Sequence, residues 1–346
     1  MTRREGYAFP LTLGAIAIIA LIATIASAQV RASTEAMAAL TDLTRERLEA
    51  HSAEQSFLYY MLTEPSVPLG LEIGALSRFE RQFRNFQPAE TTYLVRADGS
   101  ANQIGDTPMV VRYFDEQAFF NLATTDEVTV RQLHEAFGTP SLAHDRLAAA
   151  LADFQDVDDE RRFSGAEAFE YDDPLLPANR ELRHPLEACQ VLGWAQTPVC
   201  DDPGLLLLLG AIRETSELNA SMVSAPMLDL LMRDRRAADR EFAFERAASG
   251  ELTRFGEIGL DRYDELFDPV SFPTPPRLRF AVIVHDLEGQ TAWRTDYLLT
   301  MSSQRAPFSV RGRYRIGGET VQRHLQIGPD DPLQRIPEPS DQPDQG

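Results

Sequence analysis

The sequence contains no lysine, only two cysteines and, apart from Gly14, no glycine or proline between Pro10 and Pro65. Its 33 basic residues are therefore all arginines, and 53 acidic residues bring the formal charge to −20. Such an excess of negative charge disfavours nucleic acids and anionic membrane surfaces as partners, whereas divalent cations or a basic protein surface suit it. We therefore expect no nucleic-acid partner.

Recognisable catalytic motifs are also missing. The sequence has no Gly-x-Ser-x-Gly turn, no phosphate-binding glycine loop and no His-Glu-x-x-His pair. His134-Glu135 and His144-Asp145 lie on consecutive predicted helices and could meet, but we interpret them as surface histidines. The other four histidines are scattered along the chain, at His51, His184, His285 and His324. We expect a protein that is not an enzyme.

A long apolar run is present at the N-terminus. From Tyr7 to Ala28 no residue is charged, and the polar side chains are only those of Tyr7, Thr12, Thr24 and Ser27. About twenty apolar residues in a helix are long enough to cross a bilayer core. Arg3 and Arg4 precede the run and would keep the N-terminus in the cytoplasm, so that the chain after the run would be exported.

Two kinds of leader fit this start. A secretory signal peptide would be cut after Ala26-Ser27-Ala28. A type IV prepilin leader would be cut between Gly6 and Tyr7, and the apolar run would then stay in the product. The second is favoured because residues 31–62 continue a helical pattern without a break, with apolar residues seven apart at Ala36, Leu43, Ala50 and Phe57.

The two cysteines, Cys189 and Cys200, are eleven positions apart. In an exported chain this spacing indicates a disulfide that closes a small loop. Two buried free thiols are the alternative. A metal site at the cysteines lacks further ligands, since His184 is the only histidine nearby.

Strands are predicted on both sides of a helical middle. Residues 91–96 and 109–114 have the pattern of strands, with a turn at Asp98-Gly99 between them. The predicted helices start with one that is capped at Thr124 or Thr125 and ends at Gly138, followed by helices over 142–154, 185–193, 226–232 and 234–248, with a buried apolar run at 205–209. The later strands are predicted over 277–285, 295–301, 308–316 and 320–327, with a hairpin turn at Gly317-Gly318. The order predicts a helical domain inserted into a small α/β domain.

Five acidic residues lie close together at the end of a predicted helix: Asp153, Asp156, Asp158, Asp159 and Glu160. Negative charge is unfavourable there because the helix macrodipole is already negative at that end. Either Arg161 and Arg162 or a divalent cation should compensate it. Calcium prefers several carboxylate and carbonyl oxygens on a flexible loop, so the sequence leaves both alternatives open.

Several short segments occur in an order that resembles the type II secretion minor pseudopilin K family, also called general secretion pathway protein K. No single segment is specific, and Phe154 replaces the usual tryptophan, but the order extends over most of residues 1–327. The segments are Asp115-Glu116, Asn121-Leu122-Ala123, the acidic residues 153–159, Gly165-Ala166-Glu167, Tyr171, Pro177-Ala178-Asn179-Arg180, Leu186-Glu187, Val191-Leu192-Gly193, Leu218-Asn219-Ala220 and Ala225-Pro226-Met227-Leu228.

The resemblance implies an α+β fold. An N-terminal transmembrane helix would continue into a pilin-like long helix packed on a small antiparallel sheet, with a large all-helical domain inserted between strands. The expected parts are a prepilin leader (1–6), a transmembrane segment (7–30), the first part of a pilin-like domain (31–112), the inserted helical domain (113–270), C-terminal strands (271–327) and a disordered tail (328–346).

The resemblance also implies a function. The chain would be a single-pass protein of the inner membrane, largely periplasmic, and a structural subunit at the tip of the pseudopilus whose assembly it initiates in protein export. Its partners would be minor pseudopilins I and J, the major pseudopilin, the inner-membrane secretion platform and prepilin peptidase. Major pilins carry a glutamate where this chain has Leu11, and the tip subunit usually lacks that acid. Some members bind calcium, for which the candidate ligands here are Asp153, Asp156, Asp158, Asp159 and Glu167.

Two other functions remain open at this stage. The first is a minor pilin of a type IV pilus system. The second, from a different class, is a membrane-anchored periplasmic metal-dependent hydrolase that uses the acidic residues.

Overall fold

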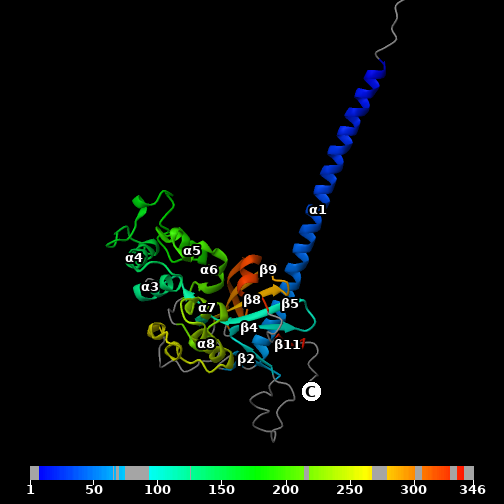
Figure 1. The fold of residues 1–346 in the computed structure, drawn as a ribbon. Helices are drawn as coiled ribbons and strands as arrows, with labels where there is room; N and C mark the ends of the chain where they lie inside the picture. Colours follow the sequence, from blue (N-terminus) through cyan, green and yellow to red (C-terminus); the bar gives the residue numbers. More distant parts are fainter. Residues whose placement is uncertain are drawn as a thin grey trace, which may run out of the picture. The chain divides into compact units, whose positions relative to one another are not determined.

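The computed structural model describes residues 8–64, 66–67, 70–74, 93–124, 126–213, 218–266, 279–300, 306–327 and 333–338 (Figure 1). The chain divides into two compact units, Met1–His51 and Ser52–Gly346. The expected cleavage site, Gly6 and Tyr7, lies outside the described residues.

The helix α1 extends without a break over Ala8–Thr63, which confirms the helix predicted over 31–62. Its Ile16–Thr63 part contains an 18-residue window with a mean hydropathy of 1.7, none of which is buried, and it is the one described helix that is long and apolar enough to cross a membrane. The hydroxyl groups of Thr24 and Ser27 donate to the carbonyl oxygens of Ala20 and Ala23. These two hydroxyl groups are therefore satisfied within the helix, as an apolar solvent requires.

The second unit is built around a six-stranded sheet in the order β10-β9-β8-β5-β4-β11. All neighbours are antiparallel except β11, which is parallel to β4. The strands are β4 (Asp98–Ile104), β5 (Met109–Asp115), β8 (Arg279–Asp286), β9 (Thr291–Leu299), β10 (Phe308–Gly317) and β11 (Gln334–Ile336). A smaller sheet joins β1 (Ser66–Val67), β2 (Gly70–Ile73) and β3 (Tyr93–Arg96).

The last turns of α1, from Ser52 on, pack on one face of the large sheet. The ring of Phe57 lies 5.4 Å from that of Tyr113 on β5. The Tyr297 hydroxyl on β9 donates to Glu54 Oε1 over 2.7 Å. Ala53, Phe57 and Met61 are buried, as the helical pattern predicts. The expected packing of a long helix on a small antiparallel sheet is thus confirmed.

The other face of the sheet contacts the inserted domain through Arg294 of β9, whose side chain is 1% exposed. The Nη1 atom of Arg294 donates to the carbonyl oxygens of Leu207 and Gly210, over 2.7 and 2.8 Å, and its Nε atom donates to Asp296 over 2.7 Å. The guanidinium carbon lies 4.1 Å from the centre of the Phe119 ring. The buried guanidinium group of Arg294 therefore joins the sheet to the insert.

The insert lies between β5 and β8, as predicted. Its helices are α3 (Glu127–Ala136), α4 (His144–Gln155), α5 (Pro198–Asp201), α6 (Pro203–Leu209), α7 (Ala225–Leu231) and α8 (Ala237–Ser249), joined by 3-10 turns. The prediction of an all-helical insert is wrong in one detail, because β6 (Phe120–Asn121) and β7 (Gly210–Ala211) form a parallel pair. The cap of α3 is also not a threonine: Asp126 accepts the Thr129 N–H over 2.9 Å.

Three further predictions near the strands are wrong. Asp98-Gly99 begins β4 instead of forming a turn. Gly317-Gly318 is not a hairpin turn, because residues 318–324 form α9 (Gly318–His324) and not a strand. The tail predicted as disordered from residue 328 contains β11. In α9 and just after it, Val321 and Leu325 are buried four positions apart, which is helical spacing.

Candidate functional site

The acidic residues predicted as a site lie at the C-terminal end of α4 and in the irregular segment after it. Leu147, Leu151 and Phe154 are buried along one side of α4 and fix the helix in the insert. The Asp156 N–H donates to the Ala152 carbonyl oxygen and ends the helix. The chain then continues to a 3-10 turn, η3 (Ala168–Glu170).

Arg162 closes this acidic turn. Its Nη1 atom donates to Asp153 Oδ1 over 2.8 Å and also to Asp156 Oδ2. The two carboxylates hold the pKa of Arg162 above its usual value. The side chain of Asp153 is fully buried, whereas that of Arg162 is half exposed. Arg161 pairs instead with Glu170 over 2.7 Å. Compensation by arginine, one of the two predicted alternatives, is therefore observed for Asp153 and Asp156.

Glycine is required beside this pair. A Cβ atom on Gly165 would lie 1.9 Å from Asp153 Oδ2, which is too close for any side chain at this position. The backbone of the turn can therefore approach the buried carboxylate closely only because position 165 has no side chain.

Glu167 is the unusual member of the cluster. It is 1% exposed, and neither of its carboxylate oxygens has a hydrogen-bond partner. Burial raises its pKa to about 7, helped by the negative charges of Asp153 and Asp156. A buried, charged carboxylate without a partner lowers the stability of the folded state. Glu167 should therefore be neutralised by a proton or paired with a cation.

Two further oxygens near the turn share this lack of partners. Asp156 Oδ1 and Asn179 Oδ1 are buried and accept no hydrogen bond. Asn179 has a positive φ of 47° and donates through Nδ2 to Asp159 Oδ1 over 3.4 Å. Carboxylate and amide oxygens are the ligands that calcium prefers. Sequence reasoning did not select Asn179 as a site residue, although it lies in the Pro-Ala-Asn segment of the resemblance.

The five predicted ligands are thus not equivalent. Asp153 is fully engaged by Arg162, Asp158 and Asp159 are exposed, and Glu167 is buried without a partner. Within the described ranges, no three His, Cys, Asp or Glu side chains are arranged so that they could hold a metal ion. Calcium therefore stays a prediction.

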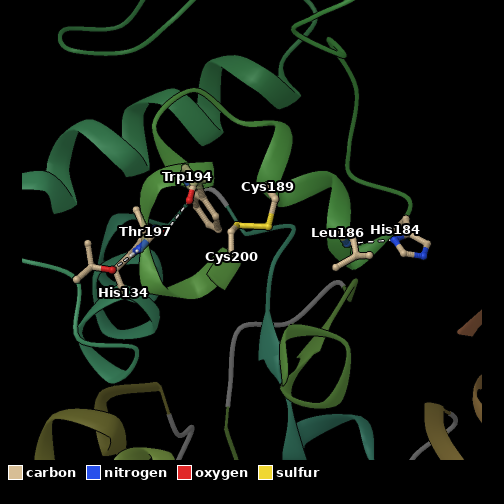
Figure 2. The surroundings of a disulfide bond; sticks show 8 residues. His134, His184, Leu186, Cys189, Trp194, Thr197 and Cys200 are labelled. Atoms are coloured by element: carbon tan, nitrogen blue, oxygen red, sulfur yellow. Dashed lines mark hydrogen bonds between the residues drawn. A yellow bond between two sulfur atoms is a disulfide. The ribbon is translucent and has the colours of Figure 1, made fainter. Parts of the chain in front are cut away.

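The predicted disulfide is present, and the free-thiol alternative is not observed. Cys189 on η4 (Pro185–Gln190) is bonded to Cys200 on α5, with 5.8 Å between the Cα atoms (Figure 2). Trp194 lies in the loop that the bond closes, and its Nε1 atom donates to the Leu147 carbonyl oxygen of α4 over 3.0 Å. The disulfide loop thus supports the helix that carries the acidic turn.

The interpretation of His134 and His144 as surface residues is wrong. Both are buried, with ring centres 6.2 Å apart. His134 also contacts Trp194 edge to face at 4.5 Å (Figure 2). Its Nδ1 atom lies 3.2 Å from Thr139 Oγ1. Burial, and then the neighbouring His144, lower the pKa of His134 to about 3. The pair is a packed core contact that holds α3 against α4.

Comparisons with known proteins do not show to which family the chain belongs. No protein family matches the sequence, and no curated protein is similar to it. Among solved structures, the chain is similar to the GspK-GspI-GspJ complex from the type 2 secretion system of enterotoxigenic Escherichia coli. The identity is 17%, the match covers 83% of this chain and 99% of that chain, and the TM-score is 0.39. A TM-score this low carries no argument about function.

Proposed function

We propose that this protein is a K-type minor pseudopilin of a type II secretion system, a structural subunit and not an enzyme. The observation that carries the proposal is the double use of α1. Its early turns expose large apolar side chains, such as Ile16 at 64% and Ile19 at 66%, while its last turns contribute Phe57 to the core of an antiparallel sheet. One uninterrupted helix therefore serves as both membrane anchor and core helix, as a pilin requires.

The inserted domain adds to this argument. The chain order of long helix, β4 and β5, helical insert, and β8 to β10 is the order that the sequence resemblance implies. In this proposal the N-terminus is cytoplasmic, α1 is anchored in the inner membrane and the remainder is periplasmic. Minor pseudopilins I and J would join the chain in a tip complex that initiates the pseudopilus and supports export across the outer membrane.

The N-terminus of the mature protein tests the proposal. Prepilin peptidase should cut between Gly6 and Tyr7, so intact-mass spectrometry of the purified protein should find a chain that begins at Tyr7. A Gly6→Leu variant should keep its leader, while a Gly14→Ala variant, changed inside the anchor, should be processed normally. A chain that begins at Gln29 would show an ordinary signal peptide and remove the pseudopilin assignment.

A secretion assay separates this proposal from a type IV pilus subunit. Deleting the gene should stop release of the host's secreted proteins into the medium and leave surface pili intact. Loss of pili with normal secretion would favour the pilus subunit.

We also propose that the acidic turn holds a structural calcium ion. Three side chains, Asp156, Glu167 and Asn179, have buried oxygen atoms without a hydrogen-bond partner, and these oxygens are suitable calcium ligands. Asp158 and Asp159 add negative charge beside them. The ion would neutralise these carboxylates and take over the role that Arg162 has at Asp156.

Thermal unfolding with and without calcium tests this site. An ion that binds only the folded state raises the free energy of unfolding by about 2.7 kcal/mol when its concentration is a hundred times its dissociation constant. The melting temperature should rise accordingly. Asp156→Asn with Glu167→Gln should abolish the shift, and Asp145→Asn, at an exposed position on the same helix, should leave it unchanged. No shift in the unmutated protein would leave the arginine-paired turn as the complete account.

A further inference from the structure

Three large apolar side chains project into solvent from the segment that follows the acidic turn. Phe163 is 98% exposed, Phe169 75% and Leu175 83%. Single apolar residues are common on protein surfaces, whereas several in one short exposed segment indicate a contact site. Neither the sequence patterns nor the proposed function uses these side chains.

Contacts within the fold do not account for them. The guanidinium carbon of Arg161 lies 6.0 Å from the centre of the Phe169 ring and covers only part of it. Phe163 and Leu175 are almost as exposed as they would be in an unfolded chain. Because apolar surface is more stable away from water, burial against a partner would be favourable for all three side chains.

The backbone that carries these side chains is held in place. Arg161 forms an ion pair with Glu170 over 2.7 Å, on either side of the stretch that contains Phe163 and Phe169. The Glu167 N–H donates to Glu170 Oε2 over 2.9 Å. Side chains on a fixed backbone lose less freedom when they bind than those on an unfolded loop, so this segment is suited to contact a partner.

The charge of the same segment, residues 158–175, is negative and uncompensated. Its two arginines already pair with carboxylates. Five other carboxylates of the segment are exposed, and no arginine of the described residues pairs with any of them. They are Asp158, Asp159, Glu160, Asp172 and Asp173. The segment therefore presents apolar side chains among free negative charges.

We propose that residues 158–175 bind a protein partner whose surface combines apolar side chains with a border of lysine or arginine. Phe163 and Phe169 would pack against the apolar part, and the free carboxylates would face the basic border. Aromatic side chains in the centre of an interface with charges at its rim are a common arrangement. An anionic membrane does not fit, because it would repel the carboxylates. The proposal does not depend on the pseudopilin assignment.

Peptide binding to the full chain in detergent tests the proposal. The probe is a fluorescein-labelled helical peptide with leucine on one face and lysine on the other, and its binding is followed by fluorescence anisotropy. Phe163→Ala combined with Phe169→Ala should weaken binding about tenfold or more, because the apolar contact is lost. Phe242→Ala is the matched control, since Phe242 is an exposed phenylalanine of α8 outside the segment, and it should leave binding unchanged.

A second pair of variants tests the charges. Asp172→Asn combined with Asp173→Asn should weaken binding and reduce its dependence on salt concentration. Asparagine keeps an oxygen that can accept the Leu175 N–H, as Asp173 does over 2.9 Å. Asp234→Asn combined with Glu241→Gln removes two exposed carboxylates elsewhere in the insert and should have little effect.

The proposed calcium site overlaps the start of the segment, so each titration is made with calcium and again with EDTA. The loss of binding in the Phe163 and Phe169 double variant should appear in both buffers, and the melting temperature should not change because both side chains are exposed. Unchanged affinity of this variant in both buffers would overturn the proposal. Equal losses in the control variants would also overturn it, since they would show attraction of the peptide to the overall charge of −20.

Discussion

At the scale of single residues, hydrogen-bond geometry fixes the protonation state of His285. Arg112 Nε, always a donor, lies 3.0 Å from His285 Nε2, so this nitrogen must be unprotonated. The other nitrogen, Nδ1, lies 2.7 Å from the Asp286 carbonyl oxygen and must carry the hydrogen. Burial, and then the charge of Arg112, lower the pKa of His285 to about 4 from its ordinary 6.5.

This neutral histidine predicts a loss of stability in acid. Its contribution is complete above pH 6.5, where folded and unfolded states are both neutral, and it decreases as pH falls toward 4, because only the unfolded state takes up the proton. We expect a loss of about 1–2 kcal/mol from this residue between pH 7 and pH 5, measured by urea unfolding. The His285→Gln variant keeps an acceptor for Arg112 and does not titrate. Between pH 7 and pH 5 its free energy of unfolding should therefore fall about 1–2 kcal/mol less than that of the unmutated protein. Parallel pH profiles of the two proteins would contradict the prediction.

The site residues differ in how far the sequence could predict them. The disulfide between the two cysteines follows from their spacing and from the expectation that the chain is exported. The clustering of Asp153 and Asp156 with Arg162 also follows from their nearness in the sequence. The burial of Glu167 and the position of Asn179 could not be predicted, because they depend on how the segment after α4 folds back on the helix.

At the scale of elements, periodicity predicted most of what the structure shows, including α4, β8, β9 and β10. It failed at α9, where Thr320 to Ile327 was assigned to a strand. The segment is short enough that alternating and helical patterns overlap, and only the tertiary contacts that bury Val321 and Leu325 decide between them. The failure at β11 is similar, since a three-residue strand has too few residues to show a pattern.

The disulfide loop is an element whose contribution can be measured. Cys189 and Cys200 close a loop of eleven residue steps, and cross-linking removes conformations from the unfolded chain. Replacing both cysteines by serine should therefore lower the free energy of unfolding by about 3 kcal/mol. Urea unfolding of the variant, with the unmutated protein under reducing conditions as a second reference, measures this. Less than about 1 kcal/mol would mean that Trp194 and its hydrogen bond to α4 hold the loop without the bond.

The joint between sheet and insert gives a second prediction at this scale. Arg294→Leu removes the donor for the carbonyl oxygens of Leu207 and Gly210 and leaves Asp296 without its cation. We expect a loss of about 3–5 kcal/mol in the free energy of unfolding, measured with urea. Arg323→Leu is the control: its pairs with Glu319 and Asp202 are at the surface, so the loss should be below about 1 kcal/mol. Similar losses in both variants would contradict the prediction that Arg294 stabilises the contact between the sheet and the insert.

At the scale of the whole molecule, the sequence predicted the order of the parts better than their boundaries. The apolar start, the continuous helix, the helical middle and the final strands all follow from hydrophobic patterns that extend over many residues. The boundary of the insert does not, because β5 continues to Asp115, whereas the resemblance implies an insert that begins at residue 113. A boundary depends on a few hydrogen bonds, whereas an element depends on a whole pattern.

The proposed position at the filament tip predicts how one anchor residue tolerates change. In a pilin filament, a glutamate five residues after the cut meets the N-terminal amine of the subunit ahead, and this chain has Leu11 there. With no subunit ahead, Leu11→Glu would leave an unpaired carboxylate in the bilayer, which costs up to about 3 kcal/mol on insertion scales. We expect Leu11→Glu to reduce the amount of secreted protein in the medium, while Leu11→Val, which keeps the position apolar, should secrete normally, with equal amounts of both variants in the membrane by immunoblot. Normal or increased secretion by Leu11→Glu would show that a neighbour lies ahead of this subunit, and the chain would then belong within the filament and not at its tip.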